Sequence, residues 1–297
     1  MTEHISPTPN PSPAARGEGD VARLIYNIIQ SVRARHPDRP ALIGVSGAQG
    51  CGKTYVCHLL EAANRPRFAH FSLDDVYLTK AKRLQNAATW AEFFNERGAF
   101  RDLYPSRSER EEIARATEPL FVVRGPPGTH DLGLAGGVIA RLGTEAVTRL
   151  PRFDKVIDDR AAEETWPLFQ GPAQAILIDG WCLGALPPEY GAPINDVERQ
   201  DVAGFWRKQS ELALEKNYTN FFASFDAIVY LRAPNWEIVR KWRGQQEEQT
   251  LGRKLTAEEE TKLDRFLMFY ERITKSMMAG AHCATHVVQL DETRRVI

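Results

Sequence analysis

Eight consecutive residues have the types and spacing of a loop that binds the phosphates of a nucleotide. They fit the pattern G-x-x-x-x-G-K-[ST] in full, and they are Gly47, Ala48, Gln49, Gly50, Cys51, Gly52, Lys53 and Thr54. Glycines let backbone N–H groups curl around a phosphate, and the following helix adds its positive end. Lys53 can reach the β- and γ-phosphates, and the Thr54 hydroxyl can ligate Mg²⁺. A chance glycine-rich turn is the alternative, but the motif follows an expected strand and opens an expected helix, which favours nucleotide binding.

Carboxylates stand at the ends of two apolar runs, where they could take part in phosphoryl transfer. Asp179 ends the run Ala-Ile-Leu-Ile and could hold Mg²⁺ opposite Thr54, directly or through water. Asp74 and Asp75 close an earlier run, which we expect to lie beside the strand of the phosphate loop. A carboxylate there could orient and deprotonate an acceptor hydroxyl next to the γ-phosphate. Taken alone, such a pair is more often a turn or helix cap, and Asp179 could likewise cap its strand.

Two loops offer positive charge for an anionic substrate. The chain has 38 Lys and Arg against 39 Asp and Glu, a net charge of −1, so local cations must hold such a substrate. The candidates in loops 124–131 and 151–155 are Arg124, His130, Arg152 and Lys155. Arginine matches the geometry of a carboxylate. Each cation singly could be a solvated surface charge, and the histidine could cap a helix or be structural.

Two further arginines lie in the helix expected after residues 227–233. Arg240 and Arg243 are three positions apart and share a helical face. They could close over the phosphates of ATP as a lid and supply charge to the transition state. An ordinary exposed helix face explains the same spacing equally well.

The elements that must position these residues alternate along the chain. Apolar runs predict strands, and three- to four-residue periodicity predicts helices. We expect strands at 41–46, 67–75, 173–181, 227–233 and 286–290, and helices from 21, from 53, and at 131–142, 196–218, 235–246 and 256–278. Such alternation indicates an α/β fold with a mostly parallel sheet covered on both faces. Ligands then sit beyond the carboxyl ends of the strands, just after residues 46, 73, 178 and 232.

Composition narrows the class of protein further. The near-neutral charge gives no electrostatic footprint for nucleic acid or an anionic membrane, and no apolar run approaches the ~18 residues of a membrane span. Four cysteines without a CxxC pair disfavour disulfides or a zinc site and favour the cytoplasm. Residues 1–20, with alternating prolines, predict a disordered tail without a secretory signal. Residues 21–297 predict one domain, with a helical insertion at about 79–120.

Several segments occur together and in an order that is similar to one enzyme family. They are the phosphate loop, SLDDVYLT, RGPPGTHD, PRFDK, TWP followed by ILIDGW, and WRGQQE. Between about residues 41 and 291 the chain closely resembles the plant-type D-glycerate 3-kinase family, within the phosphoribulokinase/uridine kinase group. The resemblance implies a three-layer P-loop NTPase fold with a helical lid at about 235–255, ATP and Mg²⁺ as cofactors, and phosphorylation of D-glycerate, a small hydroxy acid, to 3-phosphoglycerate.

The resemblance also implies roles for individual residues. Asp74 would be the base, in line with Tyr77 beside it, while Lys53 and the lid arginines would neutralise the transferring group. The substrate would be surrounded by Asp74, Tyr77, Arg124, His130, Arg152 and Lys155, and Arg240 would contact the nucleotide. Asp179 departs from the glutamate of the family's pattern, and its shorter side chain is expected to hold the metal through water.

Other readings share the same motifs. Uridine kinase, pantothenate kinase and phosphoribulokinase use the same scaffold and are alternatives. A site for a nucleoside requires aromatic side chains for stacking and amide donors, whereas loops 124–131 and 151–155 of this chain supply cations. A regulatory ATP-binding protein without a small-molecule acceptor is a different class, because a phosphate loop reports binding rather than turnover.

Overall fold

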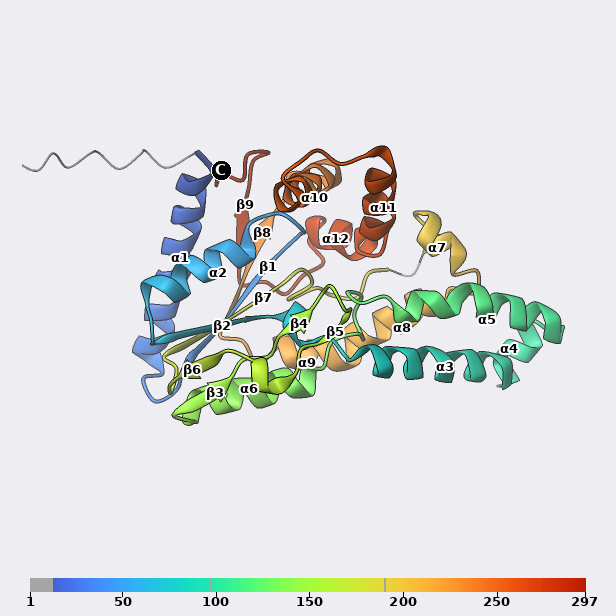
Figure 1. Ribbon diagram of the computed structural model, residues 1–297, viewed down its shortest axis with the longest axis horizontal. Coiled ribbons are helices and arrows are strands. Elements are labelled where there is room, and N and C mark those ends of the chain that lie inside the picture. Colours follow the sequence, from blue (N-terminus) through green and yellow to red (C-terminus); the bar gives the residue numbers. More distant parts are fainter. Residues whose placement is uncertain (1–12, 97, 190) are drawn as a thin grey trace, which may run out of the picture.

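A five-stranded parallel sheet forms the centre of the molecule (Figure 1). The computed structural model describes residues 13–96, 98–189 and 191–297. The strand order is β2-β7-β1-β8-β9, and every neighbouring pair is parallel. The strands are β1 (Ala41–Gly47), β2 (Phe68–Ser72), β7 (Ala175–Gly180), β8 (Ala227–Arg232) and β9 (His286–Gln289). The predicted α/β class with a parallel sheet is confirmed.

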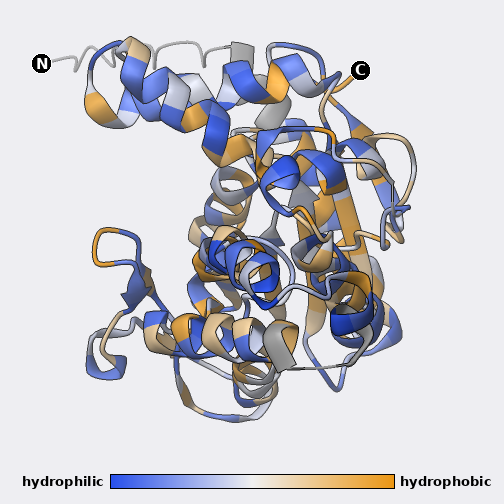
Figure 2. Cartoon of the chain, turned by 90° about the vertical axis from the view of Figure 1, so that its right-hand side faces the viewer, coloured by the Kyte–Doolittle hydropathy of each residue, from blue (hydrophilic) through white to orange (hydrophobic). Residues whose placement is uncertain are grey.

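The two faces of the sheet pack against separate hydrophobic cores. Alternate residues of a strand point to opposite faces, so Leu42 of β1 belongs to one core and Ile43 to the other. In β7, Ile176 and Leu177 divide in the same way. Figure 2 shows the strands largely in the colour of hydrophobic residues between helices with mixed surfaces. Burial on both faces explains why these strands appear in the sequence as continuous apolar runs.

Helices cover both faces and complete three layers. The helices are α1 (Pro13–Arg35), α2 (Lys53–Ala63), α3 (Lys80–Glu96), α4 (Gly98–Leu103), α5 (Arg107–Val122), α6 (Leu132–Thr144), α7 (Asp196–Gln200), α8 (Phe205–Ala213), α9 (Thr219–Phe222), α10 (Trp236–Leu251), α11 (Ala257–Met268) and α12 (Glu271–Met278). Helices α3 to α5 correspond to the segment expected at about 79–120 and extend away from the sheet (Figure 1). Short antiparallel pairs join β3 (Val147–Arg149) to β6 (Leu168–Gln170) and β4 (Phe153–Asp154) to β5 (Asp159–Arg160). Across the described part of the chain, none of the helices has both the length and the hydropathy that crossing a membrane requires.

The first helix begins earlier than the sequence predicts. We expected the helix from Val21, but α1 starts at Pro13, so residues 13–20 of the expected disordered tail are helical. Proline is tolerated in the first turn of a helix because the N–H groups there lack intrahelical partners. Residues 1–12 of the expected tail lie outside the described residues.

The long helix expected at 196–218 is interrupted. Helix α7 ends at Gln200, and α8 begins at Phe205 after Gly204, which has a φ of 68°. The buried carboxylate of Asp201 accepts hydrogen bonds from the backbone N–H groups of Trp206 (3.1 Å) and Arg207 (3.0 Å). These bonds satisfy backbone N–H groups at the amino end of α8, which favours the start of a new helix over one continuous helix. The periodicity of apolar residues does not reveal such a bond.

Replacing Asp201 with alanine is expected to lower the free energy of unfolding by about 2–4 kcal/mol, measured by urea denaturation. The substitution removes the cap of α8 and the carboxylate that faces the Arg207 guanidinium at 3.3 Å. Asp196→Ala is the control, because its ion pair with Arg199 is exposed and its loss should change stability by no more than about 0.5 kcal/mol. Equal effects of the two substitutions would contradict this assignment.

Candidate active site

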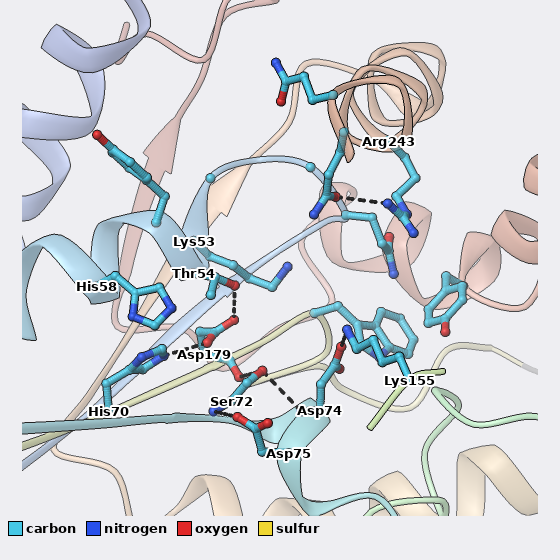
Figure 3. A pocket seen from close by; sticks show the side chains of 18 of the residues that line it. Lys53, Thr54, His58, His70, Ser72, Asp74, Asp75, Lys155, Asp179 and Arg243 are labelled. Atoms are coloured by element: carbon cyan, nitrogen blue, oxygen red, sulfur yellow. Dashed lines mark hydrogen bonds and ion pairs between the residues drawn. The ribbon is translucent and has the colours of Figure 1, made fainter. Parts of the chain in front are cut away.

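A cavity of about 610 Å³ opens beyond the carboxyl ends of β1, β2 and β7. It brings together most of the residues singled out by the sequence (Figure 3). Those that line it are Gln49, Gly50, Gly52, Lys53, Thr54, Asp74, Asp75, Tyr77, Arg152, Lys155, Asp179 and Arg243. The site therefore lies at the edge of the sheet where the alternation of strands and helices predicts it.

The phosphate loop connects β1 to α2 through backbone conformations that favour glycine. Gly52 precedes the first residue of α2 with a φ of 95°, and Gly50 has a φ of 75°. A Cβ atom on Gly50 would lie 2.7 Å from the backbone carbon of Trp242 in α10. The ammonium of Lys53 folds back over the loop to within 3.5 Å of the Ala48 carbonyl oxygen. Ala48 and Cys51 are buried under the loop, and neither they nor Gly47 line the cavity.

Gly50→Ala is expected to weaken ATP binding at least tenfold, measured with a fluorescent nucleotide analogue. The new methyl group meets the Trp242 backbone, and alanine is strained at positive φ. Gly252→Ala is the control for a methyl group at positive φ without a clash, because Gly252 has a φ of 67° but no atom within 4 Å of its Cβ position, and it should leave ATP affinity close to wild type. An ATP affinity of Gly50→Ala near the wild-type value would show that contact with α10 does not shape the loop.

Asp179 and Thr54 face each other where a metal ion is expected. The Thr54 hydroxyl donates a 2.7 Å hydrogen bond to Asp179 Oδ2, and His70 Nε2 lies 2.8 Å from Asp179 Oδ1 (Figure 3). Burial alone would raise the pKa of Asp179, but His70, Lys53 and Thr54 outweigh it, and the pKa is lowered. A hydroxyl and an ionised carboxylate are the hard oxygen donors that Mg²⁺ prefers, so these two residues fit the ion.

The two neighbouring aspartates at the end of β2 have different partners. Both lie in a 3₁₀ turn, Leu73–Val76. Asp75 accepts the backbone N–H of Ser72 at 2.9 Å and caps the turn. Asp74 instead accepts the Tyr77 hydroxyl at 2.7 Å and the Lys155 ammonium at 2.8 Å. The pair therefore combines the capping role and a position in the cavity, which the sequence presents as alternatives.

We expected the strand before Asp74 to lie beside the strand of the phosphate loop, and this prediction is wrong. β7 lies between β2 and β1 and pairs with both. Periodicity does not encode strand order, since every strand of a buried parallel sheet has the same apolar pattern. Asp74 and Lys53 nevertheless line the same cavity.

Asp74 is held in its charged form. Burial by itself would raise the pKa of this carboxyl group, and the attraction and hydrogen bond of Lys155 are the largest effects that oppose it. With further contributions from Tyr77 and Lys53, the pKa falls to about 2. The carboxylate is thus ionised at neutral pH and can accept a hydrogen bond from an approaching hydroxyl.

Arg240 and Arg243 lie on the same helix, α10, but only Arg243 lines the cavity. Arg243 lines the cavity, ion-pairs with Glu247 and lies 5.4 Å from the centre of the Phe266 ring. Arg240 is not among the cavity-lining residues and pairs with Asp264 of α11, with Nη2 at 3.0 Å from Oδ2. Side chains three positions apart point about 60° apart around the helix axis and lie roughly one turn apart along it, so the two guanidinium groups can contact different elements.

Arg124 and His130 also lie outside the lining of the cavity. Arg124 forms an ion pair with Asp158. His130 is buried, with Nδ1 at 2.6 Å from the Tyr218 hydroxyl and its ring stacked 4.6 Å from that of Tyr77. Burial lowers the pKa of His130 to about 4, so the ring is neutral at pH 7. Both residues therefore contact neighbouring side chains rather than the cavity itself.

Sequence reasoning missed several residues that line the cavity. His70 alternates with apolar residues inside β2, and its polarity in a buried strand was a usable signal. Arg294 gave no signal, because it lies in a polar segment after the last strand. Its Nε donates to the Gly50 carbonyl oxygen at 2.7 Å, and its guanidinium lies 5.1 Å from the Trp242 ring centre. The other missed lining residues include Tyr55, His58, Trp181, Gln246, Phe266 and Tyr270.

Comparison with known proteins shows that the chain is similar to kinases. No family model matches the chain. Chloroplastic D-glycerate 3-kinase of Arabidopsis thaliana is 29% identical over 225 residues, which cover 70% of this chain and 41% of that protein. A Schizosaccharomyces pombe protein described as the uncharacterized kinase mug58 is 24% identical over 279 residues, covering 86% of this chain and 90% of the relative.

A solved structure has the same fold over nearly the whole length of both chains. D-glycerate 3-kinase of Cryptococcus neoformans superposes with a TM-score of 0.65 over 93% of this chain and 97% of the other, at 21% identity. At this identity the match establishes the fold. In sequence the chain is similar to the D-glycerate 3-kinase of Arabidopsis thaliana, and its fold is that of the P-loop kinases.

Proposed function

We propose that the protein is an ATP-dependent kinase that phosphorylates D-glycerate to 3-phosphoglycerate. The observation that carries the proposal is the Asp74 carboxylate, which is bonded to Lys155 and Tyr77 and lines the same cavity as Lys53. Phosphoryl transfer requires a proton acceptor beside a group that holds the γ-phosphate. The names of the two sequence relatives support kinase activity, and that of the Arabidopsis protein supports glycerate as the acceptor.

In the proposed reaction the primary hydroxyl of glycerate attacks the γ-phosphorus of ATP. The new bond joins the hydroxyl oxygen to phosphorus, the bond to the β-phosphate oxygen breaks, and Asp74 accepts the proton. Lys53 and Arg243 neutralise negative charge on the transferring group. Thr54 and Asp179 would hold Mg²⁺, which would supply further positive charge at the phosphates.

The cations from the 151–155 loop favour a small acid as the substrate. Arg152 and Lys155 line the cavity and are half-exposed, so an entering carboxylate can reach both. Arg152 already lies 3.4 Å from Asp75, and Lys155 lies 2.8 Å from Asp74. We assign the substrate carboxylate to these two side chains. Arg124 and His130, which have partners outside the cavity, would position the surrounding loops.

The test is ADP release by the purified protein with Mg²⁺ and a panel of acceptors. D-glycerate should give turnover, and L-glycerate, uridine, pantothenate and ribulose 5-phosphate should give little. Phosphorus NMR of the product should show 3-phosphoglycerate rather than the 2-isomer. If only uridine or pantothenate gives turnover, D-glycerate is not the substrate. ATP hydrolysis that no acceptor accelerates would favour a regulatory ATP-binding protein.

A further inference from the structure

Three potential metal ligands meet on the flank of the nucleotide cavity. His58 and Glu61 belong to α2, and His70 belongs to β2. A ring nitrogen of each histidine and a carboxylate oxygen of Glu61 all lie within 4.8 Å of one another. His58 and His70 both line the cavity, and Figure 3 shows their rings side by side. None of the three is assigned a contact with the reacting groups in the proposed phosphoryl transfer.

The chemistry of this group differs from that of the Thr54–Asp179 pair. Two imidazoles and one carboxylate suit a transition-metal ion such as Zn²⁺, whereas oxygen donors suit Mg²⁺. Bonds of about 2.0–2.1 Å place tetrahedral ligands roughly 3.3 Å apart. His58 Nδ1 and Glu61 Oε2 are already 3.4 Å apart. Small side-chain movements would therefore close the site, and the half-exposed His58 side chain is able to make them.

His70 has the environment of an oriented metal ligand. Its side chain is buried, and its Nε2 lies 2.8 Å from a carboxylate oxygen of Asp179. A metal-bound histidine commonly donates its second ring nitrogen to a carboxylate, which fixes the tautomer and the ring. Ligation through Nδ1 would keep the bond to Asp179. Beside His70, Glu61 is largely covered and His58 is open to solvent, so an ion can enter and retain a water ligand.

We propose that His58, Glu61 and His70 form a binding site for a zinc-class divalent transition-metal ion, separate from the site expected for Mg²⁺. An ion there would tie α2, the helix that follows the phosphate loop, to strand β2. Because the ion binds the folded chain, it would also raise the melting temperature.

A neighbouring set of donors is a weaker candidate. Cys57, His70 and Asp179 also lie within 4.8 Å of one another, but all three are buried. Burial raises the pKa of the Cys57 thiol well above its usual value, so forming the thiolate ligand is costly. Asp179 is also engaged by Thr54. The accessible set of His58, Glu61 and His70 is therefore favoured.

The experiment titrates nucleotide-free, full-length protein with Co²⁺, whose visible absorption reports its ligands. We expect one ion per chain in equilibrium dialysis, binding at least tenfold weaker in both His58→Ala and Glu61→Gln, and a rise in melting temperature that His58→Ala abolishes. His36→Ala is the matched control, since His36 is an exposed histidine after α1 and should leave Co²⁺ binding unchanged.

Two results would overturn the proposal. One is the absence of stoichiometric Co²⁺ binding, or binding that His58→Ala leaves as strong as in the wild type. The other is a thiolate-to-cobalt charge-transfer band that disappears in Cys57→Ser, because it would assign the ion to the buried set. Circular dichroism of each variant ensures that lost binding is not lost folding.

Discussion

Replacing Asp74 with asparagine is expected to lower kcat by about 10²–10⁴-fold with D-glycerate as acceptor, while ATP binding stays close to wild type. Asparagine has nearly the same size and can still accept the Tyr77 hydroxyl, which now bonds to Asp74 at 2.7 Å. It cannot take a proton from the acceptor. Nucleotide affinity depends on the phosphate loop, which the substitution does not touch. Steady-state kinetics and a fluorescent nucleotide titration measure the two quantities separately.

Asp75→Asn provides the matched control for this variant. Asp75 carries the same functional group one residue away and lines the same cavity, but it caps the 3₁₀ turn through the Ser72 N–H and contacts Arg152, so kcat rather than KM is compared between the two variants. Its replacement should reduce stability more than kcat, because an amide oxygen is a weaker acceptor than a carboxylate. A kcat for Asp74→Asn near the wild-type value, with ATP still bound, would show that another group accepts the proton.

Replacing Lys155 with methionine is expected to raise the KM for D-glycerate about 10–100-fold, the effect of losing a charged hydrogen bond of roughly 1.5–3 kcal/mol. The same change removes the largest influence that lowers the pKa of Asp74. Without Lys155, fewer interactions offset the rise in pKa that burial causes, so the pKa of Asp74 increases from about 2. The variant should therefore combine weaker substrate binding with a changed pH profile.

The direction of the pH effect follows from the charged form of Asp74, which is the form that can act as a base. In the wild-type enzyme this form persists until the pH falls towards about 2. In Lys155→Met the acidic limb of the kcat/KM profile should appear at higher pH. The stability that ionised Asp74 contributes, lost in the wild type as the pH falls from the ordinary 3.8 through about 2, should also be smaller.

Lys262→Met serves as the control for the loss of one positive charge. Lys262 is an exposed residue of α11 that pairs only with the exposed Glu258 among the contacts described for it. Its replacement should leave both the KM for D-glycerate and the acidic limb in place. If Lys155→Met has a wild-type KM but a shifted acidic limb, Lys155 tunes Asp74 without binding the substrate carboxylate.

Features that depend on local sequence could be predicted. The strands were recognisable because burial on both faces requires continuous apolar runs, as in residues 41–47 and 175–180. The phosphate loop was recognisable because its geometry demands glycine at fixed positions, including Gly50. The start of the helix expected from residue 256 was also recognisable, and Thr256 and Glu259 form a capping box there. In each case the signal lies in a short run of neighbouring residues.

Features that depend on distant partners could not be predicted. Whether an arginine faces the cavity or a carboxylate elsewhere is decided by the fold, as with Arg240 and its partner Asp264. The helix expected at 256–278 likewise divides near Tyr270, whose ring packs 4.8 Å from that of Trp181. Strand order also depends on distant partners, because the sequence of β7 does not indicate that this strand lies between β1 and β2.

The contact between Arg294 and the phosphate loop joins residues that are 244 positions apart. At translation rates of roughly 5–20 residues per second, Arg294 is synthesised about 12–50 s after Gly50. The loop thus leaves the ribosome long before the side chain that holds its carbonyl oxygen exists. A nascent chain has the nucleotide motif before it has the Arg294 contact, so the proposed ATP binding would stabilise the finished fold rather than guide its early folding.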